Sequence, residues 1–189
     1  MPNDAIILIG PIGAGKSTIG KLLSEKLSLP QYHMDYLRWE YYKEIGYDDQ
    51  KINEQRDPDD GFWGLYRLWK PFEIHAVERL LADHPEGVID FGGGHSVYED
   101  DALFERARAA LAPFQHVVLI LPSEDLDESI RVLRERMPES PEDIHEVNAH
   151  FVHHHSNSDL AKIVVYTSGK APEQTCDEIA QAVSRKNGQ

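Results

Sequence analysis

The chain has 189 residues and a formal net charge of −14, from 33 acidic and 19 basic residues. This length suits one α/β domain with its own core, and the acidic balance excludes a general nucleic-acid binder, which needs a basic surface. The single cysteine excludes an intrachain disulfide, and the apolar run at residues 5–9 is too short to cross a membrane, so we expect a cytoplasmic protein without membrane partners.

The first predicted element is a strand that runs into a glycine-rich loop. Residues 5–9 are an unbroken β-favouring run, which predicts a buried parallel strand. The next eight residues, GPIGAGKS at 10–17, fit the pattern G-x-x-x-x-G-K-[ST]. Apolar residues then repeat at helical spacing, at Ile19, Leu22, Leu23 and Leu27. A strand before this pattern and a helix after it indicate a phosphate-binding loop.

The residue types of the loop predict how it binds ATP. Its glycines allow the backbone N–H groups to turn inward around a phosphate, and the N-terminus of the following helix faces the same anion. The Lys16 ammonium reaches the β- and γ-phosphates, and the Ser17 hydroxyl can ligate Mg²⁺. We therefore predict an ATP site over Gly10, Pro11, Ile12, Gly13, Ala14, Gly15, Lys16, Ser17 and Thr18.

Further strands and helices alternate along the rest of the chain. Short β-favouring runs predict strands at 31–35, 87–91, 116–122 and 162–167. Helical spacing of apolar residues predicts helices around 72–81, 100–111, 126–133 and 176–183. Residues 36–60 are rich in aromatic and turn residues and give no clear period. The alternation predicts a three-layer α/β fold with a five-stranded parallel sheet and right-handed crossovers.

We see no internal repeat and no linker, so we predict one domain over residues 1–189. Within it we expect an acceptor-binding subdomain at about 33–75. The segment MPESPEDIHEV at 137–147 is polar, acidic and broken by proline, which is typical of a mobile lid. We place that lid at about 136–157.

Motors, switches, pumps and small-molecule kinases all use this loop. A guanine-specific switch usually carries an N-K-x-D motif, which this sequence lacks, and a motor usually needs a longer chain. A compact chain with a glycine loop after the third strand and a polar lid favours a small-molecule kinase. The alternative is a regulatory nucleotide-binding protein with slow, acceptor-independent ATP hydrolysis.

Three segments resemble the shikimate kinase family, within the nucleoside-monophosphate-kinase-like group: ILIGPIGAGKSTIGKLLSEKL at 7–27, FGGG at 91–94 and VYTSGKAPEQTCDEI at 165–179. Residues 36–68 and 137–160 align poorly. The resemblance implies a P-loop fold, ATP and Mg²⁺ as cofactors, a lid that closes, and phosphoryl transfer to a hydroxyl of a small molecule. It also implies an adenine-side loop at Pro172. The sequence leaves a monomer and a homodimer equally open.

The family ends its second strand in an Asp-x-Asp pair, where this chain has His33-Met34-Asp35. The resemblance therefore implies that Asp35 orients the acceptor hydroxyl and accepts its proton. The alternative for Asp35 is a helix cap or a surface carboxylate. His33 does not replace the first Asp as a ligand, and we predict that Asp90, at the end of the third strand, takes over the Mg²⁺ role. The alternative is an ordinary strand-end Asp.

The acceptor side departs from the family pattern. The family holds the shikimate carboxylate with an arginine three residues before a glutamate, and the matching positions here are Lys70 and Glu73. Lysine can pair with an anion but lacks the bidentate fork of arginine. A second family arginine has no counterpart within 148–162. The resemblance implies shikimate or a related hydroxylated compound as the acceptor, and a sugar acid, a nucleoside or another hydroxylated metabolite remains open. We predict acceptor contacts at Asp35, Lys70, Gly92, Gly93, Gly94 and Asn157.

Lids of the family carry an arginine over the β- and γ-phosphates. We expect Arg136 to take that position, and one of Arg131 and Arg134 to stack on the adenine or lie near it. The alternative for all three is a solvated basic helix face. The roles of two further groups of residues stay open. The four histidines form a metal site, contact the acceptor or lie at the surface: His150, His153, His154 and His155. The aromatic run from Tyr36 to Tyr47 forms part of the core or an acceptor pocket.

Overall fold

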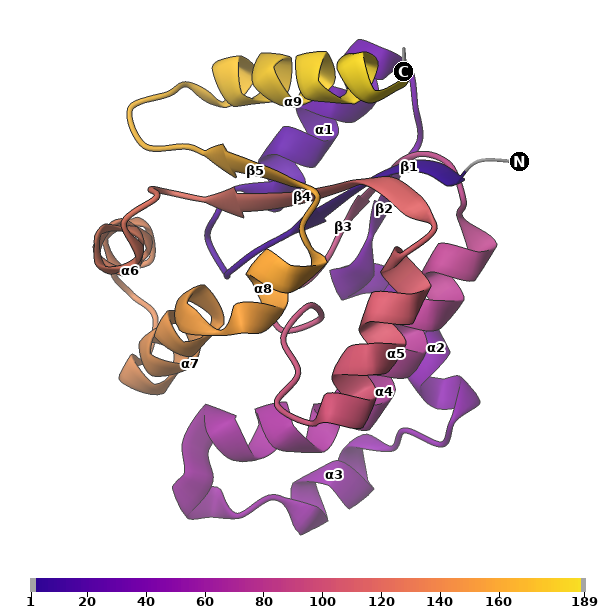
Figure 1. The fold of residues 1–189 in the computed structure, drawn as a ribbon. Helices are drawn as coiled ribbons and strands as arrows, with labels where there is room; N and C mark the ends of the chain where they lie inside the picture. Colours follow the sequence, from indigo (N-terminus) through magenta and orange to yellow (C-terminus); the bar gives the residue numbers. More distant parts are fainter. Residues whose placement is uncertain (1–2, 188–189) are drawn as a thin grey trace.

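The computed structural model of the chain describes residues 3–187. Within them, five strands form one parallel sheet in the order β2-β3-β1-β4-β5 (Figure 1). The strands are β1 Asn3–Ile9, β2 Gln31–His33, β3 Val88–Asp90, β4 Phe114–Leu121 and β5 Ile163–Tyr166. The predicted α/β fold is confirmed. Because β1 pairs with β3 on one side and β4 on the other, the loop after β1 lies where the strand order reverses, the usual ligand site of such sheets.

Helices cover both faces of the sheet. They are α1 Lys16–Leu27, α2 Met34–Glu44, α3 Asp49–Gln55, α4 Gly61–Asp83, α5 Asp101–Leu111, α6 Leu126–Arg136, α7 Glu142–His153, α8 His155–Leu160 and α9 Pro172–Asn187. Helices α1 and α9 pack side by side on one face, and α4 and α5 pack together on the other (Figure 1). In the described part of the chain, no helix combines the length and apolar character needed to span a bilayer.

The alternating side chains of β1 serve two separate cores. Ala5, Ile7 and Ile9 belong to the core beneath α4 and α5, whereas Ile6 and Leu8 belong to the core beneath α1 and α9. Because both faces of this strand are buried, its sequence is apolar throughout rather than alternating. The strand therefore holds the start of the phosphate loop rigidly in the middle of the molecule.

Residues 36–60, which gave no period, are mostly helical. They form most of α2, the helix α3 and a short 3-10 turn at Pro58–Asp60. The rings of Trp39, Tyr42 and Tyr47 pack against one another and against α4. Tyr41 is buried and Tyr36 is exposed. Most of the aromatic run is therefore core, which is the first of the two roles considered for it.

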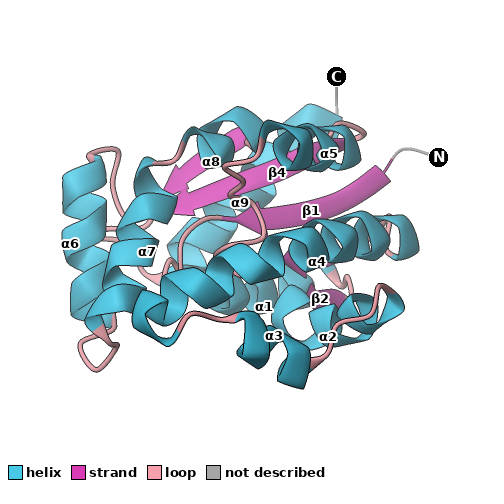
Figure 2. Cartoon of the chain, turned by 90° about the horizontal axis from the view of Figure 1, so that it is seen from below, coloured by secondary structure: helices cyan, strands magenta, loops and turns pink. Residues whose placement is uncertain are grey.

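The segment predicted as a mobile lid is largely helical and packed. It contains α7 and the start of α8, and α7 lies beside α4 (Figure 2). Val147, Phe151 and Val152 of α7 are buried, which the polar residues between them hide in the sequence. The mobility and the bounds given to the lid, and those of the acceptor-binding subdomain, stay predictions.

Candidate active site

The phosphate loop is curled around its own lysine. The Nζ of Lys16, the first residue of α1, donates to the carbonyl oxygens of Gly10 at 2.8 Å and Pro11 at 2.7 Å. A Cβ at Gly10 would lie 2.4 Å from the Ile120 carbonyl oxygen. The three loop glycines have positive φ, a conformation that favours glycine: Gly10, Gly13 and Gly15. The loop thus has the backbone shape predicted for phosphate binding.

Burial lowers the pKa of Lys16 to about 8, because the ammonium loses its water, and the charges of Asp35 and Asp90 oppose this shift. Lys16 is therefore protonated below about pH 8 and increasingly neutral above it. A bound phosphate favours the protonated form.

This shift predicts that ADP binding weakens in alkaline solution. From about pH 7 to about pH 9, we expect the Kd for ADP to rise about tenfold, since the protonated fraction of Lys16 falls by about that factor. Titration calorimetry in two buffers of different ionisation enthalpy should also show that the protein takes up about one proton when ADP binds at about pH 9. A constant Kd without proton uptake would show that Lys16 keeps its charge without a ligand.

Asp90 lies against the phosphate loop, held by three side chains. Its carboxylate accepts hydrogen bonds from Ser17 Oγ at 2.9 Å and Gln31 Nε2 at 2.8 Å, and lies 2.9 Å from His33 Nδ1. The pairing of His33 with Asp90 across β2 and β3 explains this closeness. His33 thus positions Asp90. A serine hydroxyl and a carboxylate side by side are oxygen donors of the kind that Mg²⁺ prefers, so these residues fit that ion.

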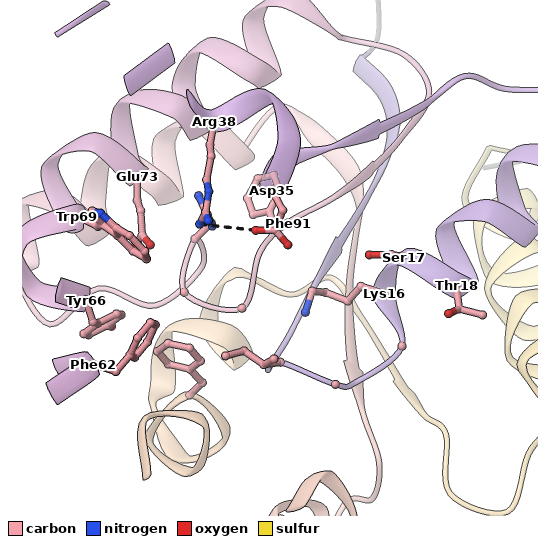
Figure 3. A pocket seen from close by; sticks show the side chains of 17 residues that line it. Lys16, Ser17, Thr18, Asp35, Arg38, Phe62, Tyr66, Trp69, Glu73 and Phe91 are labelled. Carbon is pink, nitrogen blue, oxygen red and sulfur yellow. Dashed lines mark ion pairs between the residues drawn. The ribbon is translucent and has the colours of Figure 1, made fainter. Parts of the chain in front are cut away.

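A cavity of about 600 Å³ extends from the phosphate loop to an aromatic wall. Figure 3 shows Lys16 and Ser17 on one side, Phe62, Tyr66 and Trp69 on the other, and Asp35 and Arg38 between them. A nucleotide phosphate on the loop and a second molecule against the wall would therefore share one space.

The aromatic wall is one face of α4. Phe62, Tyr66, Trp69 and Glu73 are spaced i, i+4, i+7 and i+11, which places them along one stripe of a helix. Phe91 and Phe151 complete the lining. The sequence reasoning missed this wall, because the apolar face was sought only from residue 72 onward. The helical spacing of these four residues was the sequence signal that could have revealed the wall.

Asp35 and Arg38 share a face in the first turns of α2. The Asp35 side chain is 57% exposed, and its Oδ1 lies 3.7 Å from Arg38 Nη1. The Arg38 guanidinium lies over the rings of Trp39, at 4.4 Å, and Trp69, at 5.2 Å. Its buried Nε has no hydrogen-bond partner within residues 3–187. Arg38 was not predicted, although its position three residues after Asp35 indicates a shared face.

Lys70 has a different environment from the one predicted for an acceptor ligand. Its Nζ donates to Glu73 Oε2 and to the carbonyl oxygens of Gly94 at 2.8 Å and Val97 at 2.9 Å, and lies 3.9 Å from the centre of the Tyr66 ring. An ammonium has three N–H donors, so these bonds use all of them. In this arrangement Lys70 braces the loop after β3 instead of facing an acceptor.

Asn157 is likewise committed to the protein. Its Oδ1 accepts from Ser96 Oγ at 2.7 Å and its Nδ2 donates to the Phe151 carbonyl oxygen at 2.8 Å. Asn157 is buried. The acceptor contact predicted for it therefore has no support in the geometry.

The glycine triplet packs tightly against the predicted site. Gly93 and Gly94 line the large cavity. A Cβ at Gly92 would lie 2.4 Å from Asp35 Oδ1, and one at Gly93 would lie 2.6 Å from Ile12 Cγ1. Glycine at these positions therefore lets the loop after β3 approach both Asp35 and the phosphate loop. His95, which sequence reasoning missed, also lines the cavity, and burial lowers its pKa to about 3.

The three arginines of α6 take separate positions. Arg136 donates to the Gly13 carbonyl oxygen at 3.3 Å and to Thr167 Oγ1 at 3.1 Å, and it lines a cavity of about 300 Å³ together with Thr18 and Pro172. Arg136, which was expected over the β- and γ-phosphates, thus contacts the phosphate loop through Gly13 and shares a cavity with Pro172, on the predicted adenine side. Arg131 pairs with Glu128 and Glu135, and Arg134 pairs with Glu142, all at the surface. For Arg131 and Arg134 the solvated helix face is what the structure shows.

Comparisons with known proteins show which family the chain belongs to. The model of the family described as shikimate kinase matches residues 12–184. The chain is 28% identical to the shikimate kinase of Streptomyces coelicolor, over 98% of this chain and 99% of that protein. It is similar in fold to the shikimate kinase of Acinetobacter baumannii in complex with shikimate, with a TM-score of 0.66, 20% identity and coverage of 96% and 93% of the two chains. For the shikimate kinase of Aquifex aeolicus the TM-score is 0.64, with 24% identity and coverage of 97% and 98%.

Proposed function

The chain belongs to the shikimate kinase family of small-molecule kinases, and we propose that it transfers a phosphoryl group from ATP to a hydroxyl of shikimate or a related anionic hydroxylated compound. One observation carries this proposal: the phosphate loop, Asp35 and Arg38 line the same cavity. A molecule that places its hydroxyl at Asp35 and its anionic group at Arg38 would lie beside the nucleotide phosphates.

Asp35 is the candidate for the acceptor hydroxyl. Its carboxylate is accessible, and it lies beside the glycine triplet, between Lys16 and the aromatic wall (Figure 3). In phosphoryl transfer the protein acts mainly by positioning and by stabilising charge. Asp35 would orient the hydroxyl and accept its proton, and the Lys16 ammonium would offset charge on the transferring group.

Ser17 and Asp90 are the candidates for holding Mg²⁺, which when bound neutralises charge on the nucleotide phosphates. The Ser17 hydroxyl and the Asp90 carboxylate provide oxygen ligands. Gln31 and His33 orient the carboxylate through their own hydrogen bonds. At other metal sites, hydrogen bonds of this kind fix the orientation of the ligating residue, and these two side chains would do the same for Asp90.

Arg38 is the candidate for the acceptor's anionic group. Its guanidinium lies over the rings of Trp39 and Trp69 and borders the large cavity. The Arg38 side chain is 18% exposed and lines the large cavity, so a carboxylate bound there would pair with its charge. Arg38 would thus take the role that the family pattern gives to the position of Lys70.

This assignment predicts an effect on acceptor binding. Replacing Arg38 with Ala should raise the KM for shikimate by about 10- to 100-fold with a smaller change in kcat, because hydrogen bonds to a charged partner are lost. The KM of Arg38→Lys should lie between those of the unchanged protein and Arg38→Ala, since lysine keeps the charge but lacks the bidentate fork. Steady-state kinetics at saturating ATP measures both constants.

The matched control is Arg131→Ala, which removes a surface arginine paired only with glutamates. Its KM for shikimate should equal that of the unchanged protein. An Arg38→Ala variant that also keeps this KM would rule out Arg38 as the anion ligand. A second test replaces shikimate by a neutral analogue without the carboxylate, whose KM should not respond to Arg38→Ala.

A further inference from the structure

Two of the four clustered histidines meet an acidic partner that the sequence does not reveal. Three side chains each offer one ligand atom, and these atoms lie within 4.8 Å of one another: Glu99 in the loop after β3, His150 in the last turn of α7, and His154 directly after that helix. His150 Nε2 is 2.6 Å from Glu99 Oε1, and the two imidazole rings are 5.0 Å apart. Two imidazoles and a carboxylate are a donor set typical of Zn²⁺.

The other two histidines are engaged elsewhere. His153 faces Asp127, at 3.7 Å, and His155 lies 2.7 Å from Asp159. The i, i+4 spacing of His150 and His154 brings only this pair to the same side of the helix end. His150 and His154 therefore converge on one place, whereas His153 and His155 each have a different carboxylate partner.

Glu99 has a second partner besides His150. Tyr66 Oη donates to Glu99 Oε1 at 2.7 Å, as outer partners of ligating carboxylates commonly do. The loop that carries Glu99 is braced by Lys70 through the carbonyl oxygens of Gly94 and Val97. The carboxylate thus faces the histidines from a fixed backbone, and its position does not depend on a mobile surface loop.

His154 has one competing contact. Its Nδ1 accepts a hydrogen bond of 3.2 Å from the backbone N–H of Ser156, at the start of α8. A neutral imidazole has a single lone pair, so metal binding by His154 replaces this bond. A metal would exchange one long hydrogen bond for a coordination bond.

We propose that Glu99, His150 and His154 bind one Zn²⁺ ion, which ties the loop carrying the glycine triplet to the end of α7. Glu99 and His150 also line a cavity of about 390 Å³, which leaves room for water at a fourth coordination position. The site is separate from the phosphate loop and does not depend on the proposed function. Both segments that it joins border the large cavity, through Gly93, Gly94 and Phe151.

The test uses the untagged full-length chain with Mg²⁺ and ADP in excess, so that the nucleotide site is filled. Titration with Co²⁺, followed by visible absorption, should give one tetrahedral-type site per chain that Zn²⁺ displaces, and Zn²⁺ should raise the Tm. Glu99→Gln, His150→Ala and His154→Ala should each weaken Zn²⁺ binding about tenfold or more. Circular dichroism of each variant without metal verifies that it folds.

His153→Ala and His155→Ala are the matched controls, because they remove neighbouring histidines outside the proposed site. Both should keep the Zn²⁺ affinity of the unchanged protein. Equal weakening by all four histidine variants would show diffuse surface binding and overturn the proposal. Absence of a saturable Co²⁺ spectrum would overturn it as well.

Discussion

Replacing Asp35 with Asn is expected to lower kcat for the shikimate-dependent reaction by about 10²- to 10⁴-fold, the usual contribution of a positioned acid or base. The amide has nearly the size of the carboxylate but cannot accept the hydroxyl proton. Asp35 lies beside the cavity and makes one long contact, with Arg38, so the fold should not change. The measurement is ADP release at saturating ATP and acceptor, alongside the Kd for ADP, which should stay constant.

Glu40→Gln is the matched control, because Glu40 is an exposed carboxylate of the same helix that pairs with Lys43. It should keep the kcat of the unchanged protein. If Asp35→Asn also kept that kcat, Asp35 would be only the surface carboxylate of the alternative interpretation.

Replacing Asp90 with Asn is expected to lower Mg²⁺-ATP turnover by about 10²- to 10³-fold, the scale of losing one preorganised electrostatic group. The Asp90 carboxylate is 3% exposed and lies against Ser17, so an amide there would present a weaker ligand to the metal. The Mg²⁺ concentration that gives half-maximal turnover should rise. Turnover measured over a series of Mg²⁺ concentrations gives both quantities.

A purely structural role for Asp90 makes a different prediction. Ser17 and Gln31 donate to different oxygens of Asp90. Asn can accept from Gln31 with its oxygen and donate its amide N–H to Ser17 Oγ, so ADP binding in the presence of EDTA should be nearly unchanged if Asp90 serves the metal. A large loss of metal-free ADP binding, or of Tm, would assign Asp90 to the fold instead.

The fold could be predicted because its signals are local. The apolar run of β1 reflects burial on both faces of the strand. The glycines of the phosphate loop reflect the positive φ angles at three of its positions. The closeness of Ser17 and Asp90 could also be predicted, since Asp90 ends β3 and the loop that leads to Ser17 follows the carboxyl end of the adjacent parallel strand β1. These relations depend on strand order and not on the packing of individual side chains.

The acceptor side could not be predicted in the same way. Family resemblance placed Lys70 by its position, but its role depends on the carbonyl oxygens of Gly94 and Val97, which are more than twenty residues away. The position of the Arg38 guanidinium depends on Trp69, which lies on another helix. Such partners are set by the packing of α2 against α4, and residues 36–68 are where the resemblance was weakest.

The proximity of Glu99 to the histidines could not be predicted from the sequence either. It lies 51 residues from His150, and the sequence pattern around it gives no sign that the two side chains meet. The i, i+4 spacing of the histidines was readable, whereas the third ligand depends on how the loop after β3 packs against α7.

The central claim is that this chain is a kinase with a small anionic acceptor, and ADP release with and without acceptor tests it most directly. With Mg²⁺-ATP, shikimate or a related anionic hydroxylated compound should raise ADP release well above the acceptor-free rate and yield one phosphorylated product per ADP. Lys16→Ala should abolish this activity. Slow ATP hydrolysis that no compound in a panel of shikimate, sugar acids and nucleosides stimulates would contradict the claim and favour a regulatory nucleotide-binding protein.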